Sequence, residues 1–287
     1  MNAVEQSLHF ENVVRQEWTS PTTINAWQDW SEEQSIHCKP LTDALIRHAQ
    51  LAEGQTVLDL AGGVGEPALP IARIVGATGL VVATDLSEGM LAVAADKARR
   101  EGLSNLRFEV ADVHELPYAD NSFDRVVSRL GLMYFWDIEQ AISEIHRVLK
   151  PGGVASFVVW GSPEQNEYFG SILAPFNQRR EMPAQSDDMP TPTRFGDVSK
   201  LTALFARQGF SDVASQAYCE ALPWPGTPRE LFQHFYDMAV PLQPYIDSFD
   251  DNEREAVLQE IEAAFSKRWD GKYTNAFASF NTVYLTK

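Results

Sequence analysis

The sequence predicts an α/β fold in which buried strands of a mostly parallel sheet alternate with helices. Residues 57–60 have strand character and lead directly into a glycine-rich turn, and a helical segment follows at residues 66–75. Residues 79–84 form a continuous apolar run, which is typical of a strand buried on both faces of a parallel sheet. Strand and helix patterns continue to alternate beyond this point, as they do in doubly wound sheets.

The first strand, turn and helix have the order that binds nucleotide-like ligands. Glycines at 62, 63 and 65 let a ligand approach the backbone closely, and Pro67 near the helix start costs little where an N–H is unpaired anyway. The dinucleotide-binding pattern Gly-x-Gly-x-x-Gly fails at its third glycine, and Asp59 brings negative charge that a pyrophosphate would not favour. The alternative is a simple connecting turn without a ligand.

The turn resembles motif I of class I S-adenosyl-L-methionine (SAM)-dependent methyltransferases, which is usually Asp-x-Gly-x-Gly-x-Gly. Asp59, Gly63 and Gly65 match this motif, and Ala61 replaces its first glycine. The resemblance implies a Rossmann-like, doubly wound sheet of seven mostly parallel strands, with SAM as the cofactor. It also implies that these four residues bind SAM.

The second strand ends at Asp85, twenty positions after Gly65, which is near the spacing at which such folds bind ribose hydroxyls. A carboxylate can accept a hydrogen bond from both hydroxyl groups. Residues 85–90 resemble motif II of the same family, which implies cofactor contacts from Asp85, Leu86 and Met90. The alternative for Asp85 taken by itself is an ordinary acidic loop residue.

Residues 105–111 alternate as a third strand does, and Asp112 and Val113 follow it. In the family, this pair recognises adenine through the carboxylate of the first residue and the backbone N–H of the second. The resemblance therefore assigns Asp112 and Val113 to the adenine end of the site. We expect His114 to lie at the edge of the site rather than to act in catalysis.

Residues 123–128 form the fourth predicted strand, and the residues that follow it should border the site, because ligands lie beyond the carboxyl ends of such strands. We expect Arg129 to contact the cofactor, and Met133 and Tyr134 to contact the acceptor. Some relatives have two histidines where this chain has Met133-Tyr134, so no general base is evident. Tyr134 is a poor substitute, since the unperturbed pKa of a phenol is about 10.

Residues 138–150 fit an amphipathic helix that ends at Lys150-Pro-Gly-Gly153, and residues 154–160 form the fifth strand. The run from Glu144 to Gly153 resembles the helix, stop and strand of the same methyltransferases. The resemblance is greatest to the ubiquinone/menaquinone-type branch, whose members act on small molecules.

The remaining segments surround this core. Residues 1–50 are predicted to form a helical lid in which Trp18, Trp27 and Trp30 contact the acceptor; the alternative is that these tryptophans anchor a peripheral helix. The predicted organisation continues with a SAM-binding core at 51–160, a cap insertion at 161–197 with a helix near 168–180, and the C-terminal part of the core at 198–287. That last part contains a turn at 223–228, a helical insertion at about 226–270 and a final strand at 272–287, antiparallel to its neighbours in the family's sheet.

Composition limits the partners. The 287 residues carry a formal net charge of −17, which argues against binding nucleic acid or an anionic membrane. Cys38 and Cys219 lie far apart, and the six histidines show no zinc-binding spacing, so we expect no metal. The N-terminus lacks a signal-peptide pattern, and no apolar run reaches the roughly 18 residues of a membrane helix. We therefore expect a cytoplasmic protein with a small-molecule substrate, and the sequence leaves its oligomeric state open.

These observations predict the transfer of a methyl group from SAM to a small, largely apolar acceptor, with release of S-adenosylhomocysteine. Three alternatives remain at this point: a protein that retains SAM while its site guides a cyclisation or rearrangement, a nicotinamide-dependent oxidoreductase, and a non-catalytic assembly partner.

Overall fold

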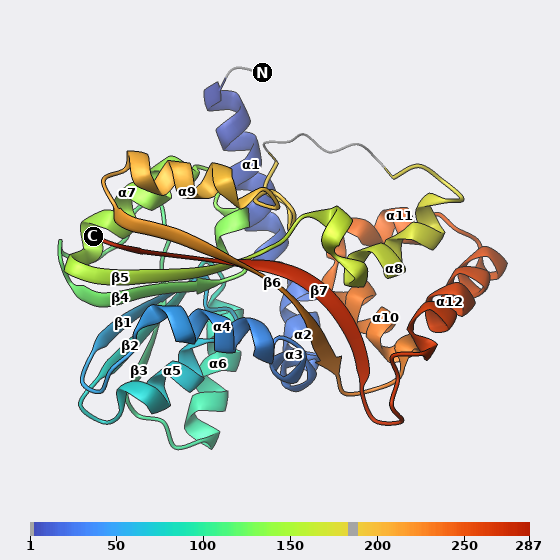
Figure 1. Ribbon diagram of the computed structural model, residues 1–287, viewed down its shortest axis with the longest axis horizontal. Helices are drawn as coiled ribbons and strands as arrows, with labels where there is room; N and C mark the ends of the chain where they lie inside the picture. The colour runs from blue at the N-terminus through green and yellow to red at the C-terminus, as the bar shows by residue number, and fades with distance from the viewer. Residues whose placement is uncertain (1–2, 183–188) are drawn as a thin grey trace.

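A seven-stranded sheet runs through the protein in a computed structural model that describes residues 3–182 and 189–287 (Figure 1). The strand order is β3-β2-β1-β4-β5-β7-β6. Strands β1 to β5 are parallel, and β7 is antiparallel to both β5 and β6. The strands are β1 (Thr56–Leu60), β2 (Leu80–Asp85), β3 (Leu106–Val110), β4 (Phe123–Arg129), β5 (Leu149–Trp160), β6 (Ser211–Trp224) and β7 (Thr274–Thr286). The predicted fold class is confirmed, including the antiparallel last strand.

Helices cover both faces of this sheet. The helices on one face are α4 (Lys39–Ala49), α5 (Ala68–Val75) and α6 (Glu88–Arg100), and those on the other are α7 (Ile138–Val148) and α9 (Val198–Arg207) (Figure 1). The sheet interior between them is apolar, with Leu58, Val126 and Phe157 fully buried at its centre. The fold thus places the carboxyl ends of β1, β2 and β4 at one edge, where the predicted site residues follow.

Additional helices gather beyond that edge (Figure 1). The N-terminal helices are α1 (Ala3–Trp18), α2 (Pro21–Asp29) and α3 (Ser31–His37), and those of the later insertions are α8 (Glu167–Asn177), α10 (Pro228–Met238), α11 (Gln243–Asp247) and α12 (Asp251–Ser266). Short 3-10 turns η1 (Leu132–Tyr134), η2 (Pro163–Gln165) and η3 (Val240–Leu242) connect neighbouring segments. Helix α10 packs against α12 and α2, and α12 packs against α8, so the insertions and the N-terminal helices are in contact. Residues 183–188 of the predicted cap insertion lie outside the described residues.

Local signals fix several helix boundaries. Pro21 occupies the first turn of α2, and the Ser20 side chain caps that helix by accepting a hydrogen bond from the Thr23 N–H. Ser87 caps α6 in the same way through the Met90 N–H. These caps separate the lid helices and begin α6 directly after Asp85.

Several predicted boundaries were wrong. Helix α5 begins at Ala68 rather than at residue 66, and α7 ends at Val148, because Leu149 already pairs with Phe123 on β4. The predicted turn at 223–228 begins too early, since β6 continues to Trp224, which pairs with Thr274. The proline at position 223 is compatible with this strand because β6 lies at the edge of the sheet.

Candidate cofactor and acceptor site

The glycine turn after β1 holds its shape through left-handed backbone angles and close packing. Gly63 has φ of 50°, and a Cβ atom at this position would meet no atom within 4 Å. Gly65 has φ of 104°, and a Cβ atom there would lie 2.4 Å from Leu69 Cδ1. Gly65 is therefore needed for packing, whereas Gly63 leaves room for a ligand beside the turn.

Ala61 adopts a left-handed conformation at the position where motif I usually has glycine. Its φ is 54°, an angle that alanine disfavours. Its Cβ faces Gly131 after β4, where an added Cβ would lie only 2.8 Å away. The departure from the motif is accommodated by a glycine on the neighbouring loop.

Asp59 and Arg129 lie beneath the turn. Asp59 is fully buried, and burial raises the pKa of its carboxyl group well above the ordinary value, an effect that Arg129 partly opposes. The backbone of Ala68 also lowers that pKa, although neither carboxyl oxygen accepts a hydrogen bond of good geometry from the described residues. Arg129 is buried too, and its guanidinium donates to Thr42 Oγ1 at 2.9 Å. Asp59 thus lies against the turn and Arg129 is anchored to α4, and their predicted cofactor contacts stay a prediction.

Asp85 stands at the carboxyl end of β2 beside the turn. Its Oδ2 accepts a hydrogen bond from the Gly63 N–H at 2.9 Å, and its Oδ1 accepts one from the Ser87 N–H at 2.9 Å. Burial raises the pKa of Asp85, while these N–H donors act in the opposite direction. Each carboxylate oxygen keeps a second lone pair, so the group fits a ribose diol. Leu86 next to it is partly exposed, and Met90 is buried.

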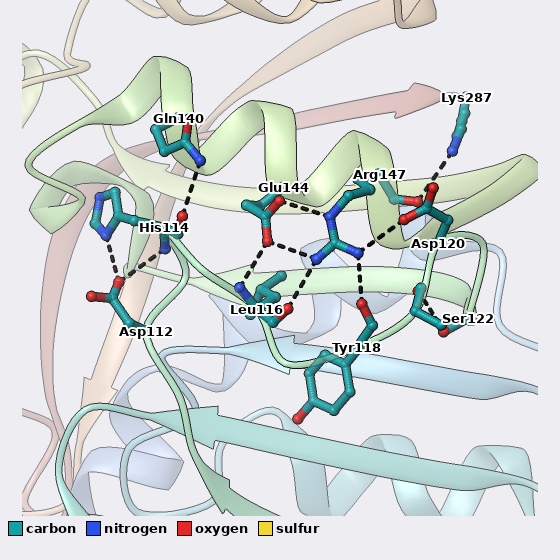
Figure 2. A network of polar contacts seen from close by, with 11 residues as sticks. Asp112, His114, Leu116, Tyr118, Asp120, Ser122, Gln140, Glu144, Arg147 and Lys287 are labelled. Atoms are coloured by element: carbon teal, nitrogen blue, oxygen red, sulfur yellow. Dashed lines mark hydrogen bonds and ion pairs between the residues drawn. The ribbon is translucent and has the colours of Figure 1, made fainter.

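Asp112 lies at the end of the next strand and is held by two protein partners. Its Oδ1 accepts a hydrogen bond from the His114 N–H at 2.9 Å and lies 2.6 Å from His114 Nδ1, as Figure 2 shows. Its Oδ2 pairs with Arg15 on α1 at 2.5 Å. Burial raises the pKa of Asp112, but the bonds from His114 and the charge of Arg15 outweigh this effect and lower it. Val113 is buried beside it. Because Arg15 belongs to α1, this helix covers the predicted adenine end.

The loop that carries Asp112 is fastened to α7 by one arginine. Arg147 donates to the backbone carbonyls of Leu116 and Tyr118 at 2.9 and 2.6 Å, and Glu144 accepts from the Leu116 N–H at 2.8 Å (Figure 2). Arg147 and Glu144 also pair with each other at 2.7 Å. This contact explains what the run from Glu144 to Gly153 does locally, since its first residues position the loop after β3.

The structure brings together two of the three lid tryptophans and Tyr134. The Trp18 ring lies 4.9 Å from that of Tyr134 and 5.7 Å from that of Trp27 between centroids. Met133 is buried next to them, and burial raises the pKa of the Tyr134 phenol, which removes it further from service as a base. Glu17 adjoins Trp18, and burial raises the pKa of its carboxyl group to about 7. Trp30 lies elsewhere, 5.4 Å from Trp224.

The surroundings of Trp30 contain two residues that no sequence pattern singled out. His37 and His234 are buried there among aromatic rings, 5.9 Å apart between ring centroids. Their positions in sequence show no motif or spacing, because one lies on α3 and the other on α10. Only the fold brings them together.

A cavity of about 280 Å³ opens behind the glycine turn, between α3 and α6. Its lining residues are Glu32, Ser35, Glu66, Lys97, Arg100 and Glu101. Charged side chains of both signs dominate this lining, which does not suit a largely apolar acceptor.

Comparison with known proteins identifies the core. Residues 57–153 match the family model described as a methyltransferase domain. These residues therefore form a methyltransferase domain. The match supports the predicted resemblance to class I SAM-dependent methyltransferases, and with it SAM as the cofactor. Gly63, Gly65 and Asp85 fit that cofactor, because the open space beside Gly63 adjoins a carboxylate at the end of β2.

Curated relatives of the chain include proteins named as methyltransferases. The chain is 35% identical over 165 residues to methyltransferase GfsG of Streptomyces halstedii, covering 56% of each protein. It is 47% identical over 102 residues to the ubiquinone/menaquinone biosynthesis C-methyltransferase UbiE of Haemophilus ducreyi, covering 35% of this chain and 39% of that protein. The chain thus spans about half of the length of GfsG and less than half of the length of UbiE.

Solved structures share the architecture of the chain. The YcgJ protein of Bacillus subtilis superposes with a TM-score of 0.57 at 18% identity, over 87% of this chain and 98% of that one. The [4+2]-cyclase SpnF superposes with a TM-score of 0.52 at 27% identity, over 86% of this chain and 80% of that one. Within residues 3–182 and 189–287, no helix is long and apolar enough to cross a membrane, and no three His, Cys, Asp or Glu side chains gather as they do around a metal ion.

Proposed function

We propose that this methyltransferase transfers one methyl group from SAM to a small, largely apolar acceptor and releases S-adenosylhomocysteine. The observation that carries the proposal is the joint placement of Gly63 and Asp85, with the carboxylate of Asp85 hydrogen-bonded to the turn at 2.9 Å. In this proposal the turn from Asp59 to Gly65 and Arg129 support the methionine end of SAM. Asp85, Leu86 and Met90 hold the ribose, and Asp112 and Val113 recognise the adenine.

The acceptor is proposed to lie between the lid helices and the ends of β4 and β5. When bound, SAM supplies an electrophilic methyl group on a sulfonium, so the protein chiefly has to orient the acceptor atom and exclude water. Orientation contributes up to roughly 7–11 kcal/mol in the best intramolecular reactions. The aromatic rings of Trp18, Trp27 and Tyr134 exclude water at the lid.

Isothermal titration calorimetry with SAM and with S-adenosylhomocysteine tests the cofactor assignment. We expect dissociation constants in the micromolar range for both. Binding weaker than about 1 mM for both ligands would remove the proposal, because the turn would then not serve this cofactor.

A second candidate function is a cyclisation or rearrangement carried out with SAM retained. The similarity to the [4+2]-cyclase SpnF, at 27% identity over most of both chains, favours keeping this alternative. Product mass separates the two reactions. A product heavier than the acceptor by one methylene group indicates methyl transfer, whereas a product of unchanged mass indicates rearrangement.

A further inference from the structure

The cavity between α3 and α6, which we call the charged cavity, is built from three separate parts of the chain. Its volume of about 280 Å³ lies near the lower limit for sites that hold small molecules. Ser35 Oγ on α3 donates to Glu66 Oε1 at 3.0 Å, which joins the lid to the end of the glycine turn at the cavity wall. The lining residues are Glu32 and Ser35 from α3, Glu66 from the turn, and Lys97, Arg100 and Glu101 from the last turn and C-cap of α6.

The charged cavity lies away from the ribose end of the proposed SAM site. A Cβ atom added at Gly65 would lie 3.2 Å from Ala94 Cβ, so the turn rests on the middle of α6. Lys97 lies one helical turn beyond Ala94, about 14 Å along the axis from the first residue of α6. Asp85, by contrast, precedes α6 and faces Gly63. A ligand in the charged cavity would therefore be a second ligand beside the cofactor.

Lys97 is the buried charge of this cavity. It is 9% exposed, and its Nζ makes no hydrogen bond of good geometry with any residue that the structure describes. Burial lowers the pKa of this ammonium group, and the carboxylate of Glu66 is the charge that opposes the effect most. An unpaired buried ammonium is costly, so a ligand that accepts a hydrogen bond from it would bind with a gain. Rotation about the last bonds of the side chain turns Nζ from its shielded position toward the cavity.

The charges on the two walls of the charged cavity have opposite signs. The wall formed by α3 and the turn carries Glu32 and Glu66, and the wall formed by α6 carries Lys97 and Arg100. Glu101 is already paired with Arg73 on α5. A purely anionic ligand would meet the acidic wall and a purely cationic one the basic wall, so both are disfavoured. A molecule with one carboxylate and one ammonium group complements both walls.

We propose that the charged cavity binds a small zwitterion of the α-amino acid type. Its carboxylate accepts hydrogen bonds from Lys97 and Arg100, and its ammonium group donates to Glu66 and Glu32. Glu66 can accept such a bond through Oε2, because Ser35 occupies Oε1. This ligand is neither SAM nor the methyl acceptor, so the inference goes beyond the proposed function and does not depend on it.

The test compares L-alanine with propionate, which lacks the ammonium group, and with ethylamine, which lacks the carboxylate. Each probe is titrated by isothermal calorimetry at pH 7.5 and constant ionic strength, against the protein alone and against the protein saturated with S-adenosylhomocysteine. We expect a dissociation constant of about 1 mM or lower for L-alanine, which is within the limit for a ligand of its size. Propionate and ethylamine should each bind at least tenfold more weakly, because each leaves one wall unpaired.

Two variants remove one charge from each wall. Lys97→Met keeps most of the side-chain volume, and Glu66→Gln keeps an oxygen that accepts from Ser35. Each should weaken L-alanine binding at least tenfold, the usual effect of losing a hydrogen bond between charged groups. Arg99→Met is the matched control, since Arg99 lies on α6 but pairs with Asp96 outside the cavity, and it should leave the affinity unchanged.

Stability provides the second readout. Because Lys97→Met removes an unpaired ammonium from a buried place, this variant should keep or raise the urea midpoint at pH 7.5. Weaker L-alanine binding in a variant of undiminished stability then reports the lost contact and not a loss of folded protein.

The outcomes separate this inference from the proposed function. L-Alanine that binds no better than propionate or ethylamine overturns the inference, and so does an unchanged affinity in both Lys97→Met and Glu66→Gln. Displacement of L-alanine by S-adenosylhomocysteine also overturns it, because the cavity would then belong to the cofactor site. Failure of S-adenosylhomocysteine to bind overturns the proposed function alone, and the titrations of the protein without it still decide the inference.

Discussion

Ala61 occupies a left-handed backbone conformation with φ of 54°, at the entrance to the turn that we assign to SAM. This conformation costs residues other than glycine about 1–2 kcal/mol. Glycine avoids that cost, but the greater freedom of its unfolded chain offsets part of the gain in stability. We therefore predict that Ala61→Gly raises the free energy of unfolding by about 1 kcal/mol in urea denaturation. Ala92→Gly, on an exposed and regular part of α6, is the control and should lower it by about 1 kcal/mol. An equal loss of unfolding free energy in Ala61→Gly and Ala92→Gly would contradict backbone strain at Ala61.

Asp85 is the residue on which the cofactor assignment depends most directly. Removing its carboxylate deletes the hydrogen bonds that this charged group would accept from the ribose hydroxyls, so Asp85→Ala should weaken SAM binding by about 1–3 kcal/mol in titration calorimetry. Asp96→Ala removes an exposed acid of α6 that pairs with Arg99, and should leave the affinity unchanged. An unaltered affinity in the Asp85 variant would show that the ribose lies elsewhere.

The sequence could predict Asp85 and the glycines because their roles depend on local spacing within one strand, turn and helix. The surroundings of Asp112 could not be predicted in this way. Its partner Arg15 lies 97 positions earlier in the chain, and no local pattern reports such a contact.

At the scale of elements, α1 lies over the predicted adenine end of the site. Arg15 pairs with Asp112, and its guanidinium lies 5.0 Å from the centroid of the Trp136 ring. The Arg15 side chain is 41% exposed, so the ion pair contributes at most about 1 kcal/mol. Such a helix opens more readily than the sheet does.

We predict that Arg15→Ala speeds hydrogen exchange of the α1 amides severalfold while the thermal midpoint changes little, because the variant frees the helix without touching the core. Mass spectrometry of peptides 3–18 measures this. Lys39→Ala, which breaks the exposed pair with Asp43, is the control and should leave α1 unchanged. Unchanged exchange in the Arg15 variant would mean that apolar contacts alone hold α1.

Prediction of the elements succeeded where the hydrophobic periodicity is strong. It failed where contacts between distant segments determine where an element ends. The alternating core strands and the amphipathic α7 were recognisable in sequence, while the extension of β6 to Trp224 depends on its pairing with β7. The convergence of α3, α8 and α10 on His37 and His234 was likewise invisible, since each helix shows only which of its faces is apolar.

At the scale of the whole molecule, buried histidines and buried carboxyl groups make stability depend on pH in opposite directions. The pKa of His37 falls from about 6.5 in the unfolded chain to about 3 in the fold, so the unfolded state binds the extra proton between these values. Stability is then lost as the pH falls below about 6.5. Glu17 has a pKa raised to about 7, so it binds a proton more tightly in the fold, and its contribution is lost as the pH rises from about 4.5 to 7.

The His37→Phe variant should therefore become more stable relative to the wild type as the pH falls. We compare the free energy of unfolding of the variant with that of the wild type at pH 5 and at pH 7.5. Because pH 5 lies about 1.5 units below the unfolded pKa of histidine, the advantage of the variant should be about 2 kcal/mol larger at pH 5. Urea denaturation at both pH values measures this difference. Glu17→Gln is the matched comparison with the opposite sign, because its gain over the wild type should grow between pH 5 and pH 7.5. A pH-independent difference for His37→Phe would mean that the ring is hydrated or hydrogen-bonded in the folded protein.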